Sequence, residues 1–572
     1  MRRAALLLLS LAAARPDGRP AAPRPACTNL TGAWQPDPVQ VTQSADGATV
    51  TTSAYWGTGA GNVSGSTLTA AFSNEAAGAP PLVGALSADC NAITWSNAAQ
   101  WWRGARPPPP PPPIASPSPP PWATRLSIYE LNTRTFTSPA GAGPDGAGSG
   151  TWAAATQRLP YLADLGVTGL WVAFYHAATA HFYGIASVYA ALDPPLLDAR
   201  LGPAADFAAF VDAAHAAGIR VFLDVIGHGL VNESRYVADN PDWFAGGSWG
   251  MTDYDYSNAG FRDWFASVWL GYVNLGVDGF RIDCGMPAAW YPFWNAVAVA
   301  AAESGHPVAI FGESGRYHFE QHDLHAPVND VAAAAAAFQA RAVGCVATVQ
   351  FSCHDSGWES APGNYFYLRG SRASFGYMGA LSPFVPLWLG GDEFDEDPVV
   401  DAPALKKDLY GTSGLPGGWM YGSLRQWAQV DGDAPGGRHA GMRDDVRALL
   451  ALGAKGAPHA DVIHHDLCAA RIAALAAQPA PALVPYARWA PGVKAVLVLG
   501  NADRARAADV ALAVPLAAMG LAGRGFYNVS FLFGGDAAPV RTPEAALAAL
   551  GVRVRADGAS GGGLAVLLVV PA

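Results

Sequence analysis

The sequence predicts an α/β protein whose central part is a (β/α)8 barrel, preceded by a small β-rich domain and followed by a β-sandwich domain. Eight strand-like runs alternate with helical patterns over roughly 300 residues, which is the unit count and size of such a barrel. A proline run separates the barrel from the N-terminal strands, and beyond residue 481 the pattern changes to strands alone. A doubly wound open sheet is the alternative, but no glycine-rich phosphate loop follows any strand.

The first residues have the pattern of a secretory signal peptide. Arg2 and Arg3 precede an apolar run from Ala4 to Ala14, which is too short to span a bilayer. We therefore expect cleavage near residue 22, so that residues 1–22 are removed and the protein is secreted or enters the secretory pathway. No later segment of the sequence has enough uninterrupted apolar residues to span a membrane.

The cysteines and glycosylation sequons agree with export. Cys27 and Cys90 bracket the first domain, and we expect them to form a disulfide. The other cysteines show no metal-ligand spacing; Cys284 and Cys353 are interpreted as buried thiols, and a Cys345–Cys353 pair stays open. The Asn-x-Ser/Thr sequons lie at Asn29, Asn62, Asn232 and Asn528.

Composition limits the classes of partner. The chain of 572 residues has a formal net charge of −11 and no basic block, which argues against nucleic acid and anionic membranes. Its hydrophobic content of 51% and its 19 Trp indicate well-packed globular domains. Many aromatic and few charged side chains suit a neutral, polyhydroxylated ligand, and we expect a monomer.

The domain at residues 27–103 is expected to be a small barrel or sandwich, with strands at 41–44, 48–54, 65–72 and 92–96. Its tryptophans are suited to stacking on sugar rings, although packing in the core and rim is the favoured interpretation. They are Trp34, Trp56, Trp95, Trp101 and Trp102. Two polyproline runs make residues 104–123 a stiff linker.

Residues 124–480 are assigned to the barrel and 481–572 to the C-terminal domain. A long insertion at 229–258 follows the third strand, where long loops usually shape the site of a barrel. The expected barrel strands are 126–131, 169–174, 220–225, 279–283, 308–313, 328–331, 346–352 and 384–389; the helices are 152–165, 206–217, 261–275, 292–303 and an alanine-rich segment ending at 343. C-terminal strands are expected at 493–499, 508–514, 527–533 and 564–570.

Acids and histidines follow the predicted strands, where a barrel places its active site. Alternate residues of a strand share a face, so Arg281 and Asp283 project together, and the guanidinium favours the ionised carboxylate. A buried structural ion pair is the simpler alternative for these two residues alone. Further groups at other strand ends favour catalysis, because a retaining glycosidase needs carboxylates meeting in one pocket. These groups are Asp224, His228, Glu313, His354 and Asp355.

Together these segments resemble the α-amylase superfamily, glycoside hydrolase family 13. The resemblance lies in Asp224 to His228, GFRID at 279–283, FGES at 311–314, His354-Asp355, GMTDYDYSN at 250–258, and HFY containing Tyr183. It implies that Asp283 is the nucleophile, Glu313 the general acid/base and Asp355 a ligand of the distorted sugar ring. The other implied roles are stacking for Tyr183, hydrogen bonding to sugar hydroxyls for His228 and His354, holding Asp283 ionised for Arg281, and orientation for Asp224.

Three departures from the family pattern concern metal and substrate. Gly227 stands where the family usually has an Asn calcium ligand, so a structural calcium is in question, and the chemistry itself requires no cofactor. Met286-Pro287 replaces a common Lys-His, and Val188 replaces a common acid. The resemblance implies an oligo- or polysaccharide substrate with α-glucosidic bonds. Alternatives are a transglycosylase or branching-type enzyme and a non-catalytic binding homologue.

Two further polar runs have simple interpretations. His464-His465-Asp466 has metal-ligating residue types, but a solvated loop is favoured. The acidic run from Gly391 to Glu396 is interpreted as a solvated rim, with lining of the cleft as the alternative.

Overall fold

The structure is a computed structural model that describes residues 30–34, 39–44, 48–54, 57–64, 67–72, 81–86, 90, 92–95, 100–102, 118–131, 133–137, 150–173, 175–178, 189–248, 251–313, 320–321, 328–341, 345–350, 371–394 and 441–572. The chain forms two compact units, the N-terminal strands and the chain from about residue 112 onward. Among the helices that lie in the described residues, none is long and apolar enough to cross a membrane.

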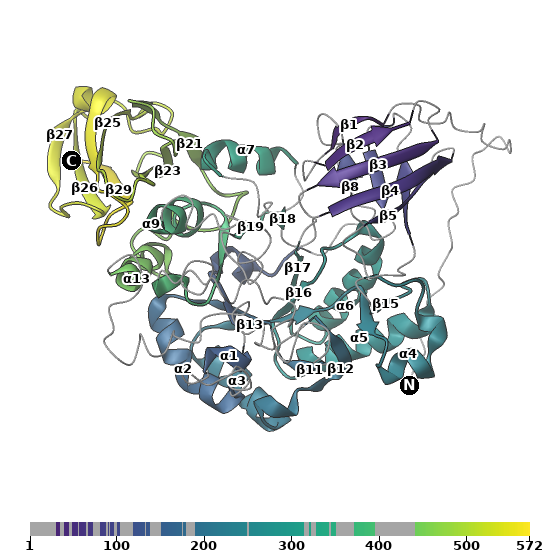
Figure 1. Cartoon of the computed structure of the whole chain (residues 1–572). Helices are drawn as coiled ribbons and strands as arrows, with labels where there is room; N and C mark the ends of the chain where they lie inside the picture. Colours follow the sequence, from purple (N-terminus) through teal and green to yellow (C-terminus); the bar gives the residue numbers. More distant parts are fainter. Residues whose placement is uncertain are drawn as a thin grey trace. The chain divides into compact units, whose positions relative to one another are not determined.

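The N-terminal unit is one antiparallel sheet of eight strands in sequence order, drawn in purple in Figure 1. Each strand pairs with its neighbour in the chain, so the described strands form one meander sheet. Of the two predicted alternatives, a small barrel or a sandwich of two sheets, the sandwich is wrong. The glycine-rich strand β4 was not predicted. A Cβ atom at its Gly61 would lie 2.3 Å from Thr69 O, so only glycine fits there. The strands are β1 (Gly32–Trp34), β2 (Val39–Gln43), β3 (Thr49–Ala54), β4 (Gly57–Ser64), β5 (Thr67–Phe72), β6 (Leu82–Leu86), β7 (Ala92–Trp95) and β8 (Gln100–Trp102).

The central sheet is the predicted barrel. Its eight parallel strands run in the order β17-β16-β13-β10-β9-β20-β19-β18, and Cα atoms of the two end strands approach within 8 Å, which closes the ring. Their bounds are β9 (Ile128–Leu131), β10 (Gly169–Val172), β13 (Arg220–Val225), β16 (Gly279–Ile282), β17 (Ala309–Gly312), β18 (Glu320–Gln321), β19 (Ala347–Gln350) and β20 (Val385–Leu389).

The sixth strand was predicted in the wrong place. The expected strand at 328–331 leads into helix α7 instead, because Asp330 Oδ1 accepts a hydrogen bond from Ala333 N and begins the helix. The actual sixth strand, β18, has only two residues, too few for an alternating pattern.

The helices alternate with the barrel strands as predicted. Helix α2 begins where the Thr151 side chain accepts from Ala154 N, and it ends at Gly166, whose φ is +99°. The helices and turns of this unit are η1 (Pro121–Arg125), α1 (Thr133–Phe136), α2 (Trp152–Leu165), η3 (Ala199–Leu201), α3 (Ala204–Ala216), α4 (Arg235–Asp239), η4 (Pro241–Trp243), α5 (Ala259–Asn274), η5 (Ala288–Trp290), α6 (Tyr291–Glu303), α7 (Val331–Arg341), α9 (Ser371–Ser374), η7 (Phe375–Ala380), η8 (Asp392–Phe394) and α13 (Met442–Gly453).

Two short antiparallel pairs extend from the loops that follow the second and third barrel strands. They are β11 (His176–Ala178) with β12 (Ala191–Leu197), and β14 (Gly229–Val231) with β15 (Met251–Asp253). The second pair belongs to the predicted insertion at 229–258. The chain after β15 lies against the end of β13, where Tyr254 N donates a hydrogen bond to His228 O.

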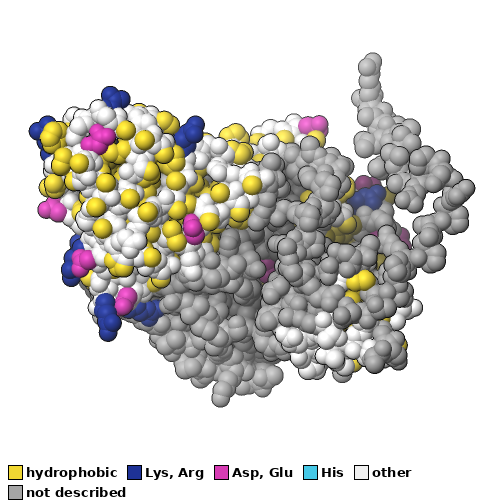
Figure 2. All heavy atoms as spheres, turned by 90° about the horizontal axis from the view of Figure 1, so that it is seen from above, with side chains coloured by type: hydrophobic (Ala, Val, Ile, Leu, Met, Phe, Trp, Pro, Cys, Tyr) yellow, Lys and Arg dark blue, Asp and Glu magenta, His cyan; other side chains and the backbone are white. Residues whose placement is uncertain are grey.

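The C-terminal strands form the predicted sandwich of two sheets around their own core, which includes Leu497, Leu512, Val552 and Leu567. In Figure 2 the face over these strands shows apolar side chains, in yellow, interspersed with white backbone and other side chains, as is ordinary for a protein surface. The larger sheet contains β21 (Ile472–Ala474), β23 (Tyr486–Ala490), β24 (Lys494–Gly500), β29 (Leu564–Pro571), β26 (Phe526–Phe533) and β27 (Val540–Pro543). The smaller contains β22 (Ala476–Gln478), β25 (Ala508–Ala513) and β28 (Leu550–Val554), with turn η10 (Glu544–Ala549).

The polar run at 464–466 is packed against the barrel rather than forming a solvated loop. His465 is 8% exposed, and its Nδ1 lies 3.2 Å from Ser382 O. The buried Arg488 donates to the carbonyls of Ser382 and His464. Burial and the charge of Arg488 lower the pKa of His465 to about 3 and that of His464 to about 4, so both imidazoles are neutral at physiological pH.

These histidines predict a loss of stability in acid. Unfolded His465 has a pKa near 6.5, so between about pH 6.5 and 3 the unfolded chain binds more protons. The stabilising contribution is complete above about pH 6.5, and at pH 4.5 the loss is on the order of 2–3 kcal/mol. Urea unfolding at pH 7.5 and 4.5 measures this loss as the difference between the two free energies of unfolding. The difference between the two pH values is expected to shrink in His465→Gln, and an unchanged difference in that variant would show that another group is responsible.

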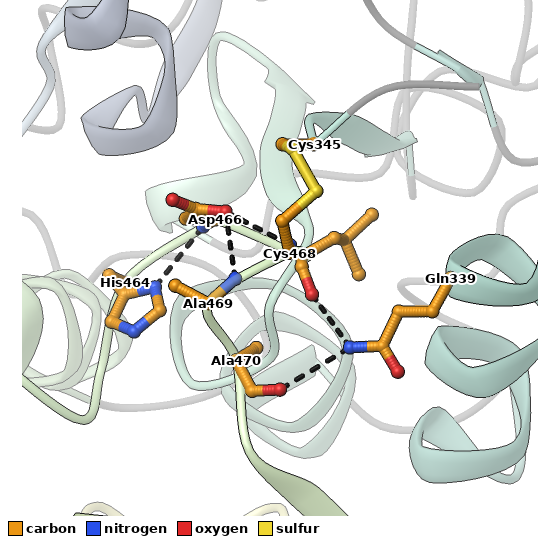
Figure 3. Close-up of a disulfide and its surroundings, with 8 residues drawn as sticks. Gln339, Cys345, His464, Asp466, Cys468, Ala469 and Ala470 are labelled. Atoms are coloured by element: carbon orange, nitrogen blue, oxygen red, sulfur yellow. Dashed lines mark hydrogen bonds between the residues drawn. A yellow bond between two sulfur atoms is a disulfide. The ribbon is translucent and has the colours of Figure 1, made fainter. Parts of the chain in front are cut away.

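One disulfide of the described residues joins Cys345, just before β19, to Cys468, just before the C-terminal strands (Figure 3). The Asp466 carboxylate accepts from Cys468 N and Ala469 N, and Gln339 Nε2 donates to Leu467 O at 2.6 Å. The Cys345–Cys353 pairing is therefore excluded. Cys90 is also disulfide-bonded; the predicted partner, Cys27, lies outside the described residues.

The acidic run after β20 is partly enclosed. Asp392 and Glu393 are buried, and Glu393 accepts hydrogen bonds from Tyr129, Tyr161 and Gly391 N. Burial raises the pKa of Glu393, and the hydrogen bonds to its carboxylate partly oppose this rise. The interpretation of these two residues as a solvated rim was wrong; they tie the end of β20 to β9 and α2.

Candidate active site

Strand β16 brings Arg281 and Asp283 to the same face at the carboxyl end of the barrel. Asp283 N donates to Val225 O at 2.8 Å, so the extended backbone continues one residue beyond the assigned strand. Residues two apart then point the same way, as predicted. Both side chains are enclosed, since Arg281 is 2% and Asp283 7% exposed.

The Arg281 guanidinium is the centre of the cluster. Its Nη1 donates to Asp283 Oδ1 at 2.8 Å and to Asp224 Oδ1 at 3.0 Å, and its Nη2 lies 3.5 Å from Glu313 Oε2. The guanidinium carbon lies 4.7 Å from the centre of the Trp171 ring. Burial acts to lower the pKa of Arg281, but the surrounding carboxylates raise it well above its usual value, so the group is a permanent cation.

Asp224 is the buried support for this guanidinium. It is fully buried at the end of β13, and its Oδ2 accepts from Trp171 Nε1 at 3.0 Å and from Tyr189 OH at 3.1 Å. Tyr175 OH donates to the Asp224 carbonyl at 2.8 Å. With both carboxylate oxygens occupied, the contacts of Asp224 fit the orienting role expected for it. Sequence reasoning missed Trp171 and Tyr189, because buried aromatic residues have no pattern that separates them from ordinary core.

Glu313 follows β17 and lies on the more open side of the cluster. Glu313 N donates to Ile282 O at 2.9 Å, and Glu313 Oε2 accepts from Cys284 N at 2.9 Å. The Glu313 side chain is 36% exposed, compared with 10% for Asp283. Asp283 is therefore enclosed against a cation while Glu313 is accessible to water, so the two carboxylates lie in different environments.

Cys284 connects the two acids through an unusual backbone conformation. Its φ is +59°, in the left-handed region that residues other than glycine rarely adopt, and Gly285 follows with φ +86°. This turn aims Cys284 N at Glu313, while the thiol donates to Asp283 Oδ2 at 3.3 Å. Cys284 is exposed, so its prediction as a buried thiol was wrong.

His228 lies beside the same carboxylate, as its place after β13 predicts. His228 Nε2 is 3.7 Å from Asp283 Oδ2, and Nδ1 is 3.9 Å from Asp253 Oδ1. Asp253 ends β15 of the insertion and was not singled out from the sequence. Its position in GMTDYDYSN, the segment that resembles a family motif, was the signal that could have identified it.

The remaining predicted residues divide into described and undescribed positions. Tyr183, His354 and Asp355 lie outside the described residues, as does the sequon Asn29. Among the other sequons, Asn62 and Asn232 are exposed, and Asn528 is partly buried on β26.

The position of the usual calcium ligand is filled by neighbouring side chains. A Cβ atom added at Gly227 would lie 2.7 Å from Ile282 Cγ2 and 2.9 Å from Trp290 Cζ3. Glycine supplies no side-chain oxygen, and the packing leaves no room for an asparagine. This position therefore does not fit a calcium ligand, and no step of the chemistry below uses a metal.

Replacing Arg281 with Lys tests the cluster. A lysine has one ammonium and cannot contact Asp224, Asp283 and Glu313 together as the forked guanidinium does. We expect kcat to fall about a hundredfold, with thermal stability lowered because Asp224 loses a buried partner. Steady-state kinetics and thermal unfolding measure the two effects, and Arg471→Lys, at an exposed site, is the matched control. Unchanged kcat in Arg281→Lys would exclude a role in catalysis for the forked shape of the Arg281 guanidinium.

Comparison with known proteins finds sequence similarity in the first part of the barrel and a similar fold over most of the chain. The family model described as alpha amylase, catalytic domain, matches residues 140–245. The malto-oligosyltrehalose trehalohydrolase of Deinococcus radiodurans is 33% identical over 166 residues, covering 27% of this chain and 24% of that protein. The 1,4-alpha-glucan branching enzyme of Pseudomonas fluorescens is 30% identical over 222 residues, covering 36% and 28%. The matched stretch thus spans about a quarter of the length of these curated relatives.

Solved structures extend the likeness over most of the chain. An α-amylase from Anoxybacillus has a TM-score of 0.58 at 14% identity, covering 79% of this chain and 99% of that one. The α-amylase of Geobacillus thermoleovorans in complex with acarbose has a TM-score of 0.56 at 13% identity, covering 78% and 98%. At these identities the likeness shows the fold.

Proposed function

We propose that the protein is a retaining glycoside hydrolase of the α-amylase superfamily, acting on α-glucosidic bonds, from its similarity to the alpha-amylase family model and to enzymes with this fold. The proposed substrates are starch- or glycogen-like glucans and maltooligosaccharides. The observation that carries the proposal is the Arg281 guanidinium, which contacts the carboxylates of Asp283 and Glu313 from neighbouring strand ends.

In the proposed reaction Asp283 attacks the anomeric carbon of the bound sugar. Its Oδ1 is held by Arg281, so the carboxylate stays ionised and aligned while the Oδ2 oxygen is free of the guanidinium. Glu313 donates its proton to the departing glycosidic oxygen, and a covalent glycosyl-enzyme forms with one inversion. Glu313 then removes a proton from water, which displaces Asp283 with a second inversion and restores the α configuration.

The remaining family positions would hold the sugar ring. His228 lies 3.7 Å from Asp283 and is placed to donate to a hydroxyl of the same ring. We propose that Asp355 and His354 bind further hydroxyls and that Tyr183 stacks on the ring. These contacts would strengthen as the ring flattens towards the transition state.

Transfer to a sugar acceptor is the second candidate function. It is favoured by relatives named 1,4-alpha-glucan branching enzyme and trehalose synthase. Hydrolysis is preferred because the 36% exposed Glu313 side chain gives water access to the intermediate. A non-catalytic binding homologue is the third candidate, but the retained Asp283, Glu313 and Arg281 argue against it.

The setting of the enzyme is proposed from the sequence and its cysteines. We propose a secreted or secretory-pathway glycoprotein that acts as a monomer on oligo- or polysaccharides. The proposed chemistry needs no cofactor. The Cys345–Cys468 disulfide agrees with an oxidising compartment, where such bonds persist.

Incubation of the purified full chain with maltoheptaose separates these candidates. Hydrolysis predicts that reducing ends increase with each bond cleaved. Transfer predicts products longer than the substrate or new branch points, with little gain in reducing ends. No turnover on α-1,4- or α-1,6-linked glucosides would favour the non-catalytic homologue and overturn the proposal.

A further inference from the structure

We propose that His228, Asp283 and Cys284 form a binding site for a divalent cation of the zinc type, whose occupancy blocks the candidate nucleophile. The proposal that a metal binds here rests on the positions of these three side chains and not on the proposed function. The loss of activity that the bound metal would cause rests on the proposed function.

The three donor atoms are spaced as a tetrahedral ion requires. Zinc lies about 2.3 Å from a thiolate and about 2.0–2.2 Å from imidazole nitrogen or carboxylate oxygen, which puts neighbouring donors about 3.4–3.6 Å apart. Cys284 Sγ lies 3.3 Å and His228 Nε2 3.7 Å from Asp283 Oδ2. All three donors lie within 4.8 Å of one another. Small side-chain movements would therefore close the site, and water or substrate would complete the coordination.

The donors contact one another or have an atom without a partner, rather than being held by other parts of the described chain. Arg281 holds Oδ1 of Asp283, which leaves Oδ2 facing the cysteine and the histidine. The His228 side chain is 10% exposed, and Nδ1 has no hydrogen-bond partner in the described part of the chain. Nε2 is too far from Asp283 for a hydrogen bond, and a cation between them would satisfy both groups. Asp253, 3.9 Å from Nδ1, is placed to orient the ring from the other side.

The donor set selects the metal. A thiolate and an imidazole favour Zn²⁺, Cd²⁺ or Cu²⁺ over Mg²⁺ and Ca²⁺, which prefer oxygen ligands. The nearby charges are negative overall, because the single Arg281 cation faces the Asp224, Asp283 and Glu313 carboxylates and Asp253 lies beside His228. The charge of the ion would therefore not meet an overall repulsive field.

Binding must release a proton. Cys284 is exposed as a residue, but its thiol lies against Asp283, and desolvation there together with the Asp283 and Glu313 carboxylates raises the pKa of the thiol well above its usual value, against the opposing charge of Arg281. The free thiol is therefore protonated, and it keeps its hydrogen bond to Asp283. On binding, the S–H bond breaks, the sulfur electron pair forms the bond to the metal, and the proton passes to buffer.

Titration of the purified full chain with Co²⁺ and Zn²⁺ tests the site without an activity assay. We expect one Co²⁺ per chain, with a near-ultraviolet thiolate-to-metal absorption band, and displacement of that band by Zn²⁺. Cys284→Ser and His228→Asn are each expected to weaken Zn²⁺ binding at least tenfold and Cys284→Ser to remove the band. His306→Asn, a part-exposed histidine 3.8 Å from Asp278, is the matched control with unchanged binding.

Calorimetry in two buffers of different ionisation enthalpy counts the released proton, and thermal unfolding of each variant verifies its fold. Equal Zn²⁺ affinity of the folded wild type and the folded Cys284→Ser variant would overturn the site. Zinc binding without turnover on any α-glucoside would uphold the site and refute the proposed function. Turnover of an α-glucoside by a protein that does not bind Zn²⁺ would uphold the proposed function and refute the metal site.

Discussion

Replacing Asp283 with Asn is expected to lower kcat on maltooligosaccharides by about 10⁴-fold or more, because an amide cannot form the glycosyl ester. The change is nearly isosteric, and the amide oxygen can still accept from Arg281. The fold should survive, although Arg281 loses one of the charges that compensate its burial. Purified variant and wild type would be compared by kcat at saturating substrate, with substrate affinity measured separately by calorimetry.

The matched control is Asp263→Asn, an exposed carboxyl-to-amide change on α5, for which kcat should be unchanged. Full activity in a folded Asp283→Asn protein would remove Asp283 from the mechanism. Loss of activity together with loss of the thermal transition would call for Asp283→Glu. That variant keeps the charge but shifts the carboxylate by one methylene, so a loss of kcat with the fold restored would still assign the nucleophile.

Removing the Cys345–Cys468 disulfide is expected to produce the largest loss of stability of any change that spares the active site. The bond closes a loop of 123 residues between β19 and the start of the C-terminal strands. A loop of that length corresponds to about 4–5 kcal/mol of chain entropy in the unfolded state, and values measured for other disulfides are often smaller. Urea unfolding of the double variant Cys345→Ser, Cys468→Ser, followed by intrinsic tryptophan fluorescence, gives the free energy.

Reductant provides the internal control for this disulfide. It should lower the barrel transition of the wild type towards that of the double variant and leave the barrel transition of the double variant in place. Equal stability of the double variant and the wild type would mean that the loop is held by its packing alone. The hydrogen bond from Gln339 to Leu467 would then be the first contact to examine.

Long periodic segments and strand ends were predictable because their signals are local. The helix at 152–165 and the strand at 220–225 were predicted to the residue, since a cap, a left-handed glycine and an apolar run mark their ends. Arg281 and Asp283 were placed on one face from the two-residue repeat of a strand alone. The β-sandwich followed from short apolar strands near the C-terminus.

The errors concern features that depend on residues distant in sequence. The sixth barrel strand has two residues, too few to carry a periodic pattern. Burial of Glu393 and His465 depends on partners such as Tyr129 and Arg488, which lie far away in the chain. The pairing of Cys345 with Cys468 likewise joins segments that only the folded barrel brings together, and spacing cannot identify such a pair.

The anomeric configuration of the first product tests the central claim most directly. Proton NMR of a maltooligosaccharide digest, recorded before the released sugar mutarotates, distinguishes the α and β anomers at the new reducing end. Two displacements at one carbon, through an ester on Asp283, predict the α anomer as the initial product. Initial release of the β anomer would mean a single displacement by water and would contradict the assignment of Asp283 as a nucleophile.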